Sequence, residues 1–493
     1  MAEKWSGAVR VADLNDFIAP SQACVVNLKG QKQSEEEQQG QAKDGLVQIQ
    51  ARKIDFPQVR KAATDEAIKV SLHDCLACSG CITSAETVML QQQSTDEFVQ
   101  RLSSATQAVV VSLSPQSRAS LATHYGITPL QAFRKLTGFL KSLGVRAVFD
   151  TSCSRDLSLL ESCQEFVDRY RKAAGNSATK QGELPMLASA CPGWVCYAEK
   201  THGQHILPHI SSTKSPQQVM GTLVKRHACY RLGLRPEDIY HVTIMPCYDK
   251  KLEAARDDFI FAVDPGGGTG DSGQAGPRVT EVDSVLTSGE ILDLLESRGV
   301  DFAALEEAPL DLMLSSVDEA GHVYGVRGGA GGYLETNFRH AARVLFGQTV
   351  EGPLQMKTLR NADFKEVSLE VDGKRVLHFA AAYGFRNIQN LVRKIKQGKC
   401  EYQFVEIMAC PAGCLNGGGQ IKPRKGQTAK DLIQHLEAAY LHEVTVRDPA
   451  DNPLVQELYR TWLGGPYSEN ARSLLHTQYH ERERTVTASI SNW

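Results

Sequence analysis

The chain has 493 residues, of which 42% are hydrophobic and 23% are charged, and its formal net charge is -3. This length predicts about two to four domains with large cores. The charge balance is that of an ordinary soluble globular protein, and it is not basic enough to indicate nucleic-acid binding. The N-terminal stretch shows no secretory signal, and no window reaches about 18 uninterrupted apolar residues, so we expect neither export nor a membrane span.

The 13 cysteines are too dilute for a disulfide scaffold. Without an export signal they are expected in a reducing compartment, where clustered thiols more often hold metal or do redox chemistry. Five of them show no ligand-like spacing with glycine or proline support, and we expect these to be buried, inert thiols: Cys153, Cys163, Cys196, Cys229 and Cys400.

Residues 1–105 are predicted to form a first unit with little regular structure, in which the polar stretch 31–43 is a solvated loop or disordered insert. The segment SLHDCLACSGC then brings Cys75, Cys78 and Cys81 two residues apart from one another. Three thiols with this spacing can wrap one face of a cubane cluster, because a Cys-x-x-Cys turn points both sulfurs the same way.

The fourth ligand of this N-terminal site is not in the triplet. The bacterial ferredoxin pattern would continue with a cysteine and a proline, but Ala85 and Glu86 stand there. Cys24 is the other cysteine before residue 153 and is our candidate. The alternatives are a zinc site of three cysteines completed by His73, or an accidental cluster.

From residue 106 to 263 alternating apolar runs and amphipathic stretches predict a first α/β lobe. We expect a helix from Pro115, a helix over 128–143 closed by Gly144, and strands over 107–113, 145–150, 184–189 and 242–245. Cys191 and Cys247 come directly after the last two strands. Ligands bind at the carboxyl ends of strands in open α/β sheets, so both thiols stand where a site would form.

A second α/β lobe is expected over 264–445, after a glycine-rich loop or lobe boundary at 264–277. Its predicted elements are helices over 288–298 and 386–396 and strands over 376–382 and 402–408. The segment GVRGGAGG at 325–332 lacks the Lys-Ser/Thr ending of a phosphate loop. Its glycines are therefore expected to let the backbone pass close to another lobe or a cluster.

The last of these strands runs into Cys410 and Cys414 within EIMACPAGCLNGGGQ. Soft thiolates at this spacing suit an iron-sulfur cluster or zinc, and glycines let the backbone approach a bulky ligand closely. The pair supplies half of a four-thiolate site, and Cys191 and Cys247 stand in similarly tight contexts. Four ligands from three distant segments imply a site inside a folded core.

Three of these segments, SACPGW, MPCYDKKLEA and EIMACPAGCLNGGGQ, resemble in order the signature segments of iron-only hydrogenases. The stretch LYRTWLGGPYSENARSLLHTQY is similar to the small-subunit-like tail of that family, which we expect over 446–493. The opening DLNDFIAPSQAC and the single cysteine triplet resemble the eukaryotic iron-only-hydrogenase-like proteins. That group includes cytosolic iron-sulfur assembly factors and nuclear prelamin A recognition proteins.

The resemblance implies an α/β fold in which two α/β lobes enclose a cluster site, with a small ferredoxin-like cluster domain at the N-terminus and a helical C-terminal tail. It also implies two [4Fe-4S] clusters. Their ligands would be Cys24, Cys75, Cys78 and Cys81 for the first, and Cys191, Cys247, Cys410 and Cys414 for the second.

One departure from the hydrogenases bears on activity. The first hydrogenase signature has two adjacent cysteines, and the proton-transfer cysteine is replaced here by Ala190, which cannot donate a proton. Four positions that line the hydrogenase pocket do match, namely Met245, Lys250, Glu253 and Met408. We therefore expect a non-catalytic protein with the fold kept for another use.

The resemblance then implies a component of cytosolic iron-sulfur protein assembly, located in the cytoplasm, with the nucleus as a second expected location. It would link an early cluster scaffold to a late targeting complex, built from a WD-repeat scaffold and an associated adaptor. Trp493, an apolar anchor beside a free carboxylate, is a plausible docking point for that complex, and the alternative is that it folds back on the surface. The alternative functions are an iron-only hydrogenase or electron-transfer enzyme, and a nuclear prelamin A-binding protein.

Overall fold

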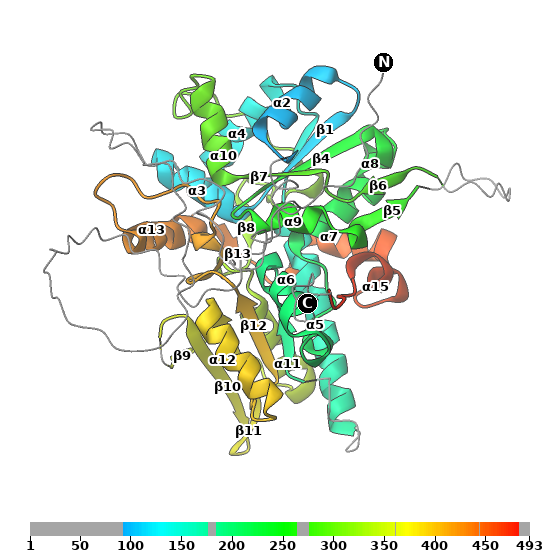
Figure 1. The fold of residues 1–493 in the computed structure, drawn as a ribbon, viewed down its shortest axis with the longest axis vertical. Coiled ribbons are helices and arrows are strands. Elements are labelled where there is room, and N and C mark those ends of the chain that lie inside the picture. The colour runs from blue at the N-terminus through cyan, green and yellow to red at the C-terminus, as the bar shows by residue number, and fades with distance from the viewer. Residues whose placement is uncertain (1–91, 176–183, 264–275, 360, 443, 483–493) are drawn as a thin grey trace, which may run out of the picture.

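The computed structural model describes residues 92–175, 184–263, 276–359, 361–442 and 444–482. Cys24, the cysteine triplet, His73 and Trp493 lie outside these residues, as does most of the glycine-rich stretch 264–277. In the described part, two α/β lobes lie one above the other, and long helices run between them (Figure 1). This arrangement is the predicted one.

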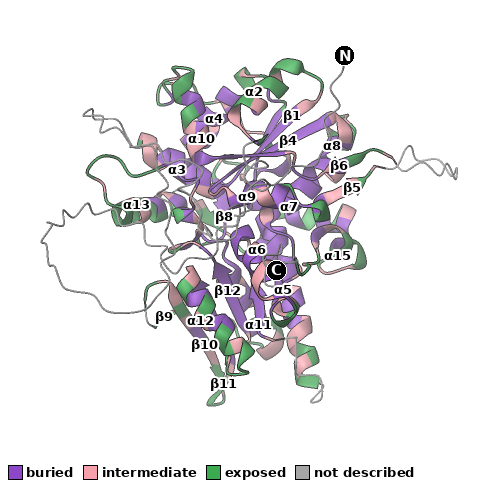
Figure 2. Cartoon of the chain, viewed as in Figure 1, coloured by how far each residue is buried: buried purple, intermediate pink, exposed green. Residues whose placement is uncertain are grey.

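The upper lobe is built on a four-stranded parallel sheet in the order β2-β1-β4-β7. Its strands are β1 (Ala108–Leu113), β2 (Ala147–Asp150), β4 (Ile239–Met245) and β7 (Ser284–Thr287). One face is covered by α2 (Thr95–Ser104), α3 (Pro115–Tyr125), α4 (Pro129–Ser142) and α10 (Ser288–Ser297). The strands are buried along nearly their whole length, as Figure 2 shows, because helices cover both faces of a parallel sheet.

Helix α4 shows how the local sequence sets an element. The Thr128 side chain accepts the backbone N–H of Gln131, whose own side chain accepts the N–H of Thr128, and Pro129 occupies the first helical position. Beyond the helix, Gly144 has a φ of 102°, a left-handed conformation that glycine adopts without strain. The predicted helix over 128–143 is confirmed.

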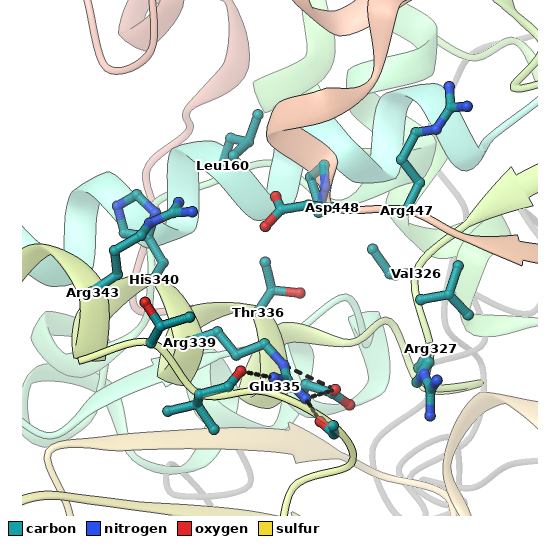
Figure 3. A pocket seen from close by; sticks show the side chains of 15 residues that line it. Leu160, Val326, Arg327, Glu335, Thr336, Arg339, His340, Arg343, Arg447 and Asp448 are labelled. Atoms are coloured by element: carbon teal, nitrogen blue, oxygen red, sulfur yellow. Dashed lines mark hydrogen bonds and ion pairs between the residues drawn. The ribbon is translucent and has the colours of Figure 1, made fainter. Parts of the chain in front are cut away.

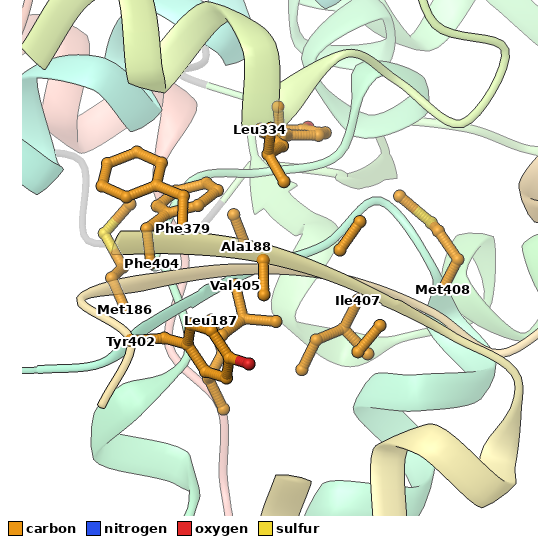
Figure 4. Packing of buried hydrophobic residues seen from close by; sticks show 14 of the residues in the cluster. Met186, Leu187, Ala188, Leu334, Phe379, Tyr402, Phe404, Val405, Ile407 and Met408 are labelled. Atoms are coloured by element: carbon orange, nitrogen blue, oxygen red, sulfur yellow. The ribbon is translucent and has the colours of Figure 1, made fainter. Parts of the chain in front are cut away.

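The lower lobe holds a five-stranded sheet in the order β3-β12-β11-β10-β9. Its strands are β3 (Met186–Ala188), β9 (Lys357–Thr358), β10 (Phe364–Val371), β11 (Lys374–Tyr383) and β12 (Phe404–Met408). The first three strands in this order are parallel and the last two pairings are antiparallel. In the core between this sheet and its helices, the rings of Phe379 and Phe404 stack with centroids 4.9 Å apart (Figure 4).

Helices α6 (Pro192–Thr201), α11 (Tyr333–Phe346) and α12 (Phe385–Lys396) belong to the lower lobe. The remaining elements are α7 (Pro216–Leu223), α8 (Cys229–Arg231), α9 (Asp249–Ala254), β5 (Ile260–Ala262), β6 (Arg278–Thr280), β8 (Val323–Gly325), α13 (Ala429–Leu441), β13 (Val444–Val446), α14 (Pro453–Leu458) and α15 (Glu469–Leu475). None of the helices in the described ranges is both long and apolar enough to cross a membrane.

The two sheets exchange strands along the chain. Strand β3 precedes residue 263 but pairs with β12 of the lower sheet, and β7 follows residue 264 but pairs with β4 of the upper sheet. A division between residues 263 and 264 therefore does not separate the lobes, in contrast to the expectation from sequence. Apolar periodicity identifies strands, but it carries no information on which strands pair.

Helix α5 (Ser152–Gly175) packs into both lobes and so joins them. Its residues Cys153 and Leu157 lie in the core below the upper sheet, whereas Leu159 and Phe166 lie in the core of the lower lobe. Most of this helix is buried, because it has neighbours on nearly every side. The relative position of the two sheets consequently depends on α5.

A buried histidine on β4 predicts how stability responds to pH. His241 is fully buried, its Nε2 lies 2.8 Å from the Ser112 hydroxyl, and its Nδ1 lies 3.0 Å from the Glu281 carbonyl oxygen. Burial lowers the pKa of His241 from its ordinary 6.5 to about 4. The unfolded chain therefore binds one more proton than the fold between these pH values, and stability is lost as pH falls through this window.

In the native chain, His241 contributes about 2 kcal/mol to the loss of unfolding free energy between pH 7 and pH 5. We expect the His241→Gln variant to lack this contribution, so that its unfolding free energy falls less over the same pH range. Gln retains hydrogen-bonding capacity but does not titrate. Urea unfolding at several pH values measures this difference. Equal pH slopes in the two proteins would contradict the assignment, whatever the variant's stability at pH 7.

Candidate metal centre

Four cysteines lie on three loops at the carboxyl ends of strands. Cys191 follows β3 and is the residue that precedes α6, Cys247 follows β4, and Cys410 and Cys414 follow β12. Strands β3 and β12 are neighbours in the lower sheet, whereas β4 belongs to the upper sheet. The predicted position of the cysteines at strand ends is confirmed, and it places them between the two lobes.

Hydrogen bonds join the cysteine loops to one another. The backbone N–H of Gly419 donates to the Pro246 carbonyl oxygen at 2.9 Å, which ties the β12 loop to the β4 loop. The N–H of Ala409 donates to the sulfur of Cys191 at 3.4 Å. The Ser189 hydroxyl accepts the N–H of Cys191 at 3.0 Å, which fixes the entry to α6. All three loops are thus bound into one structure.

The thiols also lie within electrostatic reach of one another. Burial, the carboxylate of Asp249, and then the charges of Cys410 and Cys191 hold the pKa of Cys247 well above its ordinary value. Burial and the charge of Cys191 raise the pKa of Cys414 to about 12. Bringing these thiols to the thiolate form therefore requires a compensating positive charge, which bound iron or another metal supplies.

Glycines allow the loops to approach so closely. A Cβ atom on Gly417 would overlap the Pro246 carbonyl oxygen, and one on Gly419 would lie 2.6 Å from the Thr287 side chain. Gly413 has a φ of 73°, and a Cβ atom there would lie 2.6 Å from that of Ala330. These glycines thus let protein segments come close to one another, whereas their expected approach to a bulky ligand stays a prediction.

The glycine-rich segment 325–332 also lies close to the loop that carries Cys414. A Cβ atom on Gly329 would overlap the side chain of Leu415, which is adjacent to Cys414. The Gln116 amide donates to the Gly329 carbonyl oxygen at 2.9 Å, so α3 holds this segment in position. The glycines of 325–332 were expected to let the backbone pass close to another lobe or a cluster, and the structure shows that Gly329 passes close to the loop that carries Cys414.

The donor set is chemically suited to an iron-sulfur cluster, since all four candidate ligands are sulfur atoms. Across the described ranges, no three His, Cys, Asp or Glu side chains are gathered closely enough to hold one metal ion. A cubane cluster differs from a single ion because it presents a separate iron to each thiolate, so its ligands stand farther apart. The residues present fit such a cluster in donor type, in origin from several loops, and in the glycine cradle.

Comparison with known proteins identifies the family. The profile described as "Iron only hydrogenase large subunit, C-terminal domain" matches residues 107–418, and the one described as "Iron hydrogenase small subunit" matches residues 430–482. The chain belongs to the iron-only-hydrogenase-like family. The match to the small subunit begins at residue 430. The small-subunit-like tail was predicted to begin at residue 446.

Curated relatives of this iron-only-hydrogenase-like chain match it from end to end. It is 59% identical over 497 residues to "Protein NAR1" of Arabidopsis thaliana and 50% identical over 504 residues to "Cytosolic iron-sulfur assembly component 3" of Pongo abelii, with 100% of each chain covered. It is also 47% identical over 501 residues, again with 100% of each chain covered, to "Cytosolic Fe-S cluster assembly factor narfl" of Xenopus tropicalis.

Solved [FeFe]-hydrogenase structures share the fold. One, determined in a study of oxygen inactivation of the H cluster, is 31% identical with a TM-score of 0.65 and covers 79% of this chain and 99% of its own. Another, from a study of stepwise H-cluster assembly, is 30% identical with a TM-score of 0.63 and covers 80% of this chain and 98% of its own. The predicted hydrogenase-like fold is confirmed.

Beside Cys414, this family member has a cavity of about 50 Å³ lined in part by Ala190, Met245 and Lys250. The methyl group of Ala190 has no proton to give. The ammonium group of Lys250 is already engaged with the Glu253 carboxylate at 2.8 Å. The cavity therefore retains a lysine but has no proton donor at position 190.

The other two pocket positions named from the sequence also lie near the thiols. The sulfur of Met408 is 3.8 Å from that of Cys414, and Glu253 lines a small cavity together with Cys191. Among the five cysteines expected to be inert, Cys153, Cys163 and Cys229 are buried as predicted, whereas Cys196 and Cys400 are only partly so. Burial raises the pKa of Cys196 to about 12, which keeps it in the thiol form.

Sequence reasoning missed an ion pair that lies next to this region. Arg256 donates to both carboxylate oxygens of Glu199 at 2.8 and 2.9 Å, and the backbone N–H of His480 donates to the same carboxylate at 3.2 Å. Tyr479 lines the cavity that Cys191 borders. The C-terminal segment is thereby packed near Cys191, and the resemblance of that segment to a small subunit was the one signal for its position.

The glycine contacts predict the outcome of a single substitution. We expect Gly417→Ala to lower the iron and acid-labile sulfide content of anaerobically purified protein, because the new methyl group would push the β12 loop away from Pro246. Gly289→Ala is the matched control, since its Cβ atom would lie at an ordinary 3.6 Å from the Gly419 carbonyl oxygen of the same loop. Equal iron content in both variants would show that the loop contact is not needed to hold metal.

Proposed function

We propose that this protein is a non-catalytic component of the cytosolic iron-sulfur protein assembly machinery, acting in the maturation of cytosolic and nuclear iron-sulfur proteins. The observation that carries the proposal is the end-to-end match to relatives named as cytosolic iron-sulfur assembly proteins. Ala190 supports the absence of turnover, because the cavity beside Cys414 has no proton donor at that position.

The proposal includes two [4Fe-4S] clusters. One would be held by the N-terminal cysteines and the other between the lobes, with ligands Cys24, Cys75, Cys78 and Cys81, and Cys191, Cys247, Cys410 and Cys414, respectively. A cluster supplies a site for one-electron chemistry or a unit that can be passed to an apoprotein. The protein's own contribution to the second site is to exclude solvent, hold the loops together and fix the sulfur positions.

The proposed partners follow from the same role. The protein would link an early cluster scaffold to a late targeting complex, composed of a WD-repeat scaffold and its adaptor, in the cytoplasm and the nucleus. Trp493 would dock on that complex through an apolar ring beside a carboxylate. If so, Trp493→Ala weakens binding to the targeting complex without changing the iron content, which a pulldown with purified components measures.

The cluster assignment is tested by the iron and acid-labile sulfide content of anaerobically purified protein. Two cubane clusters correspond to about eight of each per chain, and losing one leaves about four. We expect Cys247→Ser and Cys410→Ser each to lose about half of the iron, whereas Cys400→Ser, which alters a partly buried cysteine outside the four, retains it. Zinc without sulfide in the native protein would refute the assignment.

The assembly role is tested in cells depleted of the protein. The activity of cytosolic iron-sulfur enzymes should fall while that of mitochondrial ones persists, and the native chain and Cys400→Ser should restore it. Cys247→Ser should not. Normal cytosolic enzyme activity after depletion would exclude the assembly role even if both clusters are present.

Hydrogen chemistry is the second candidate, because Met245 and Lys250 still line the cavity beside Cys414. A hydrogenase would carry a diiron centre with carbon monoxide and cyanide ligands, which absorb in a distinctive region of the infrared spectrum. We expect no such bands in the purified protein and no hydrogen evolution with a chemical reductant. Detection of both would replace the assembly proposal by the enzyme.

A further inference from the structure

A second cleft, lined by none of the eight candidate ligand cysteines, has the chemistry of an anion site (Figure 3). Its volume is about 350 Å³, which lies in the range of small-molecule pockets. Residues from α5, the end of β8, α11, the loop that follows α11 and the segment after β13 all contribute to its wall. Helix α5, the stretch from β8 to the loop after α11, and the segment after β13 are far apart in the sequence, so the cleft is a product of the fold.

Arginine dominates the polar part of this wall. Four arginines line the cleft, namely Arg327, Arg339, Arg343 and Arg447, against two carboxylates, Glu335 and Asp448. Two positive charges therefore remain in excess when each carboxylate is set against one arginine. Guanidinium groups favour carboxylate and phosphate because their planar N–H donors match two oxygens at once.

The internal partners of these groups leave two arginines available. Arg339 is held by the carboxylate of Glu335 at 2.7 Å, so that pair is neutralised. Asp448 accepts the backbone N–H of Ala450 at 2.9 Å, which occupies part of its carboxylate. In the described part of the chain, neither Arg327 nor Arg343 forms a side-chain hydrogen bond or ion pair, and both are exposed. Figure 3 shows them on opposite sides of the open space.

Part of the wall is apolar, beside the polar side chains of Thr336, His340 and Thr349. Leu160, Val326, Val350, Val446 and Pro449 contribute aliphatic surface to the cleft. Val446 is 48% exposed although it is hydrophobic, and it stands directly before Arg447. An apolar wall with cationic groups at its sides fits a ligand that has an apolar body and an anionic group, whereas a merely solvated charged surface would need no such wall.

We propose that this cleft binds a small organic oxyanion, meaning a molecule that carries a carboxylate or a phosphate on an apolar body. Arg343 and Arg327 supply the positive charge that attracts the anionic group, and the aliphatic side chains cover the body. The site is separate from the four cysteines between the lobes, so ligand binding here does not require the second cluster.

Isothermal titration of the full-length protein with phenyl phosphate and with phenylacetate tests this site, and inorganic phosphate serves as the probe without an apolar body. We expect saturable binding of at least one aromatic probe, about tenfold or more weaker in Arg343→Gln because a charge-assisted hydrogen bond is lost. The double variant with Arg327→Gln should bind weaker still. The preferred aromatic probe tells whether the site takes phosphate or carboxylate.

Arg393→Gln is the matched control, since Arg393 is exposed on α12 and does not line the cleft. It should bind the probes as the native chain does, and Arg343→Lys should retain most of the affinity that Arg343→Gln loses. The proposal is overturned if neither aromatic probe saturates, if the double variant binds as tightly as the native chain, or if inorganic phosphate binds as tightly as the preferred aromatic probe. Melting curves of each variant establish that it is folded.

Discussion

The two lobes meet at a direct contact between two backbone segments. Gly417 and Gly419, from the loop after the lower-sheet strand β12, lie against Pro246, from the loop after the upper-sheet strand β4. Gly419 both donates to Pro246 and accepts from Gly289, each at 2.9 Å. No residue with a Cβ atom could occupy Gly417 without moving one loop. Since Cys247 is carried by one of these loops and Cys410 and Cys414 by the other, the spacing of the thiols depends on this contact.

Buried charges then fix how the lobes dock. Arg256, which follows α9 in the upper lobe, is bound through two N–H groups by Glu199 of α6 in the lower lobe, and both side chains are nearly inaccessible. A buried pair of this kind adds little net stability compared with apolar packing, but losing one partner leaves an unpaired charge and costs about 3–5 kcal/mol. Such a pair therefore favours one docking of the lobes over others. Helix α5 supplies Leu159 to the core of the lower lobe and Leu157 to the core below the upper sheet. It therefore also holds the two lobes in this relative position.

Much of the local structure was predictable because it depends on short-range chemistry. The capping pair of Thr128 and Gln131 and the left-handed Gly144 define α4 within its own sequence, and the placement of Cys191 and Cys247 after strands follows from the apolar runs before them. The pairing of β3 with β12 and of β7 with β4 was not predictable, because it depends on segments more than 40 residues apart that share no local signal. The bond between Glu199 and Arg256 was missed for the same reason. The arginine cleft likewise gathers residues from five segments, none of which is conspicuous alone.

Holding a cluster and moving a proton make separate demands on this fold. The sulfur positions depend on backbone geometry, namely the glycines of the β12 loop and the N–H of Ala409 that donates to Cys191. Ala190 lines the cavity beside Cys414, and its methyl group has no proton to transfer. A methyl group at this position thus supplies no proton, while the glycine cradle and the contact between the lobes are in place around the thiols. Lys250 lines the same cavity and is paired with the Glu253 carboxylate at 2.8 Å, so its charge is balanced within the protein.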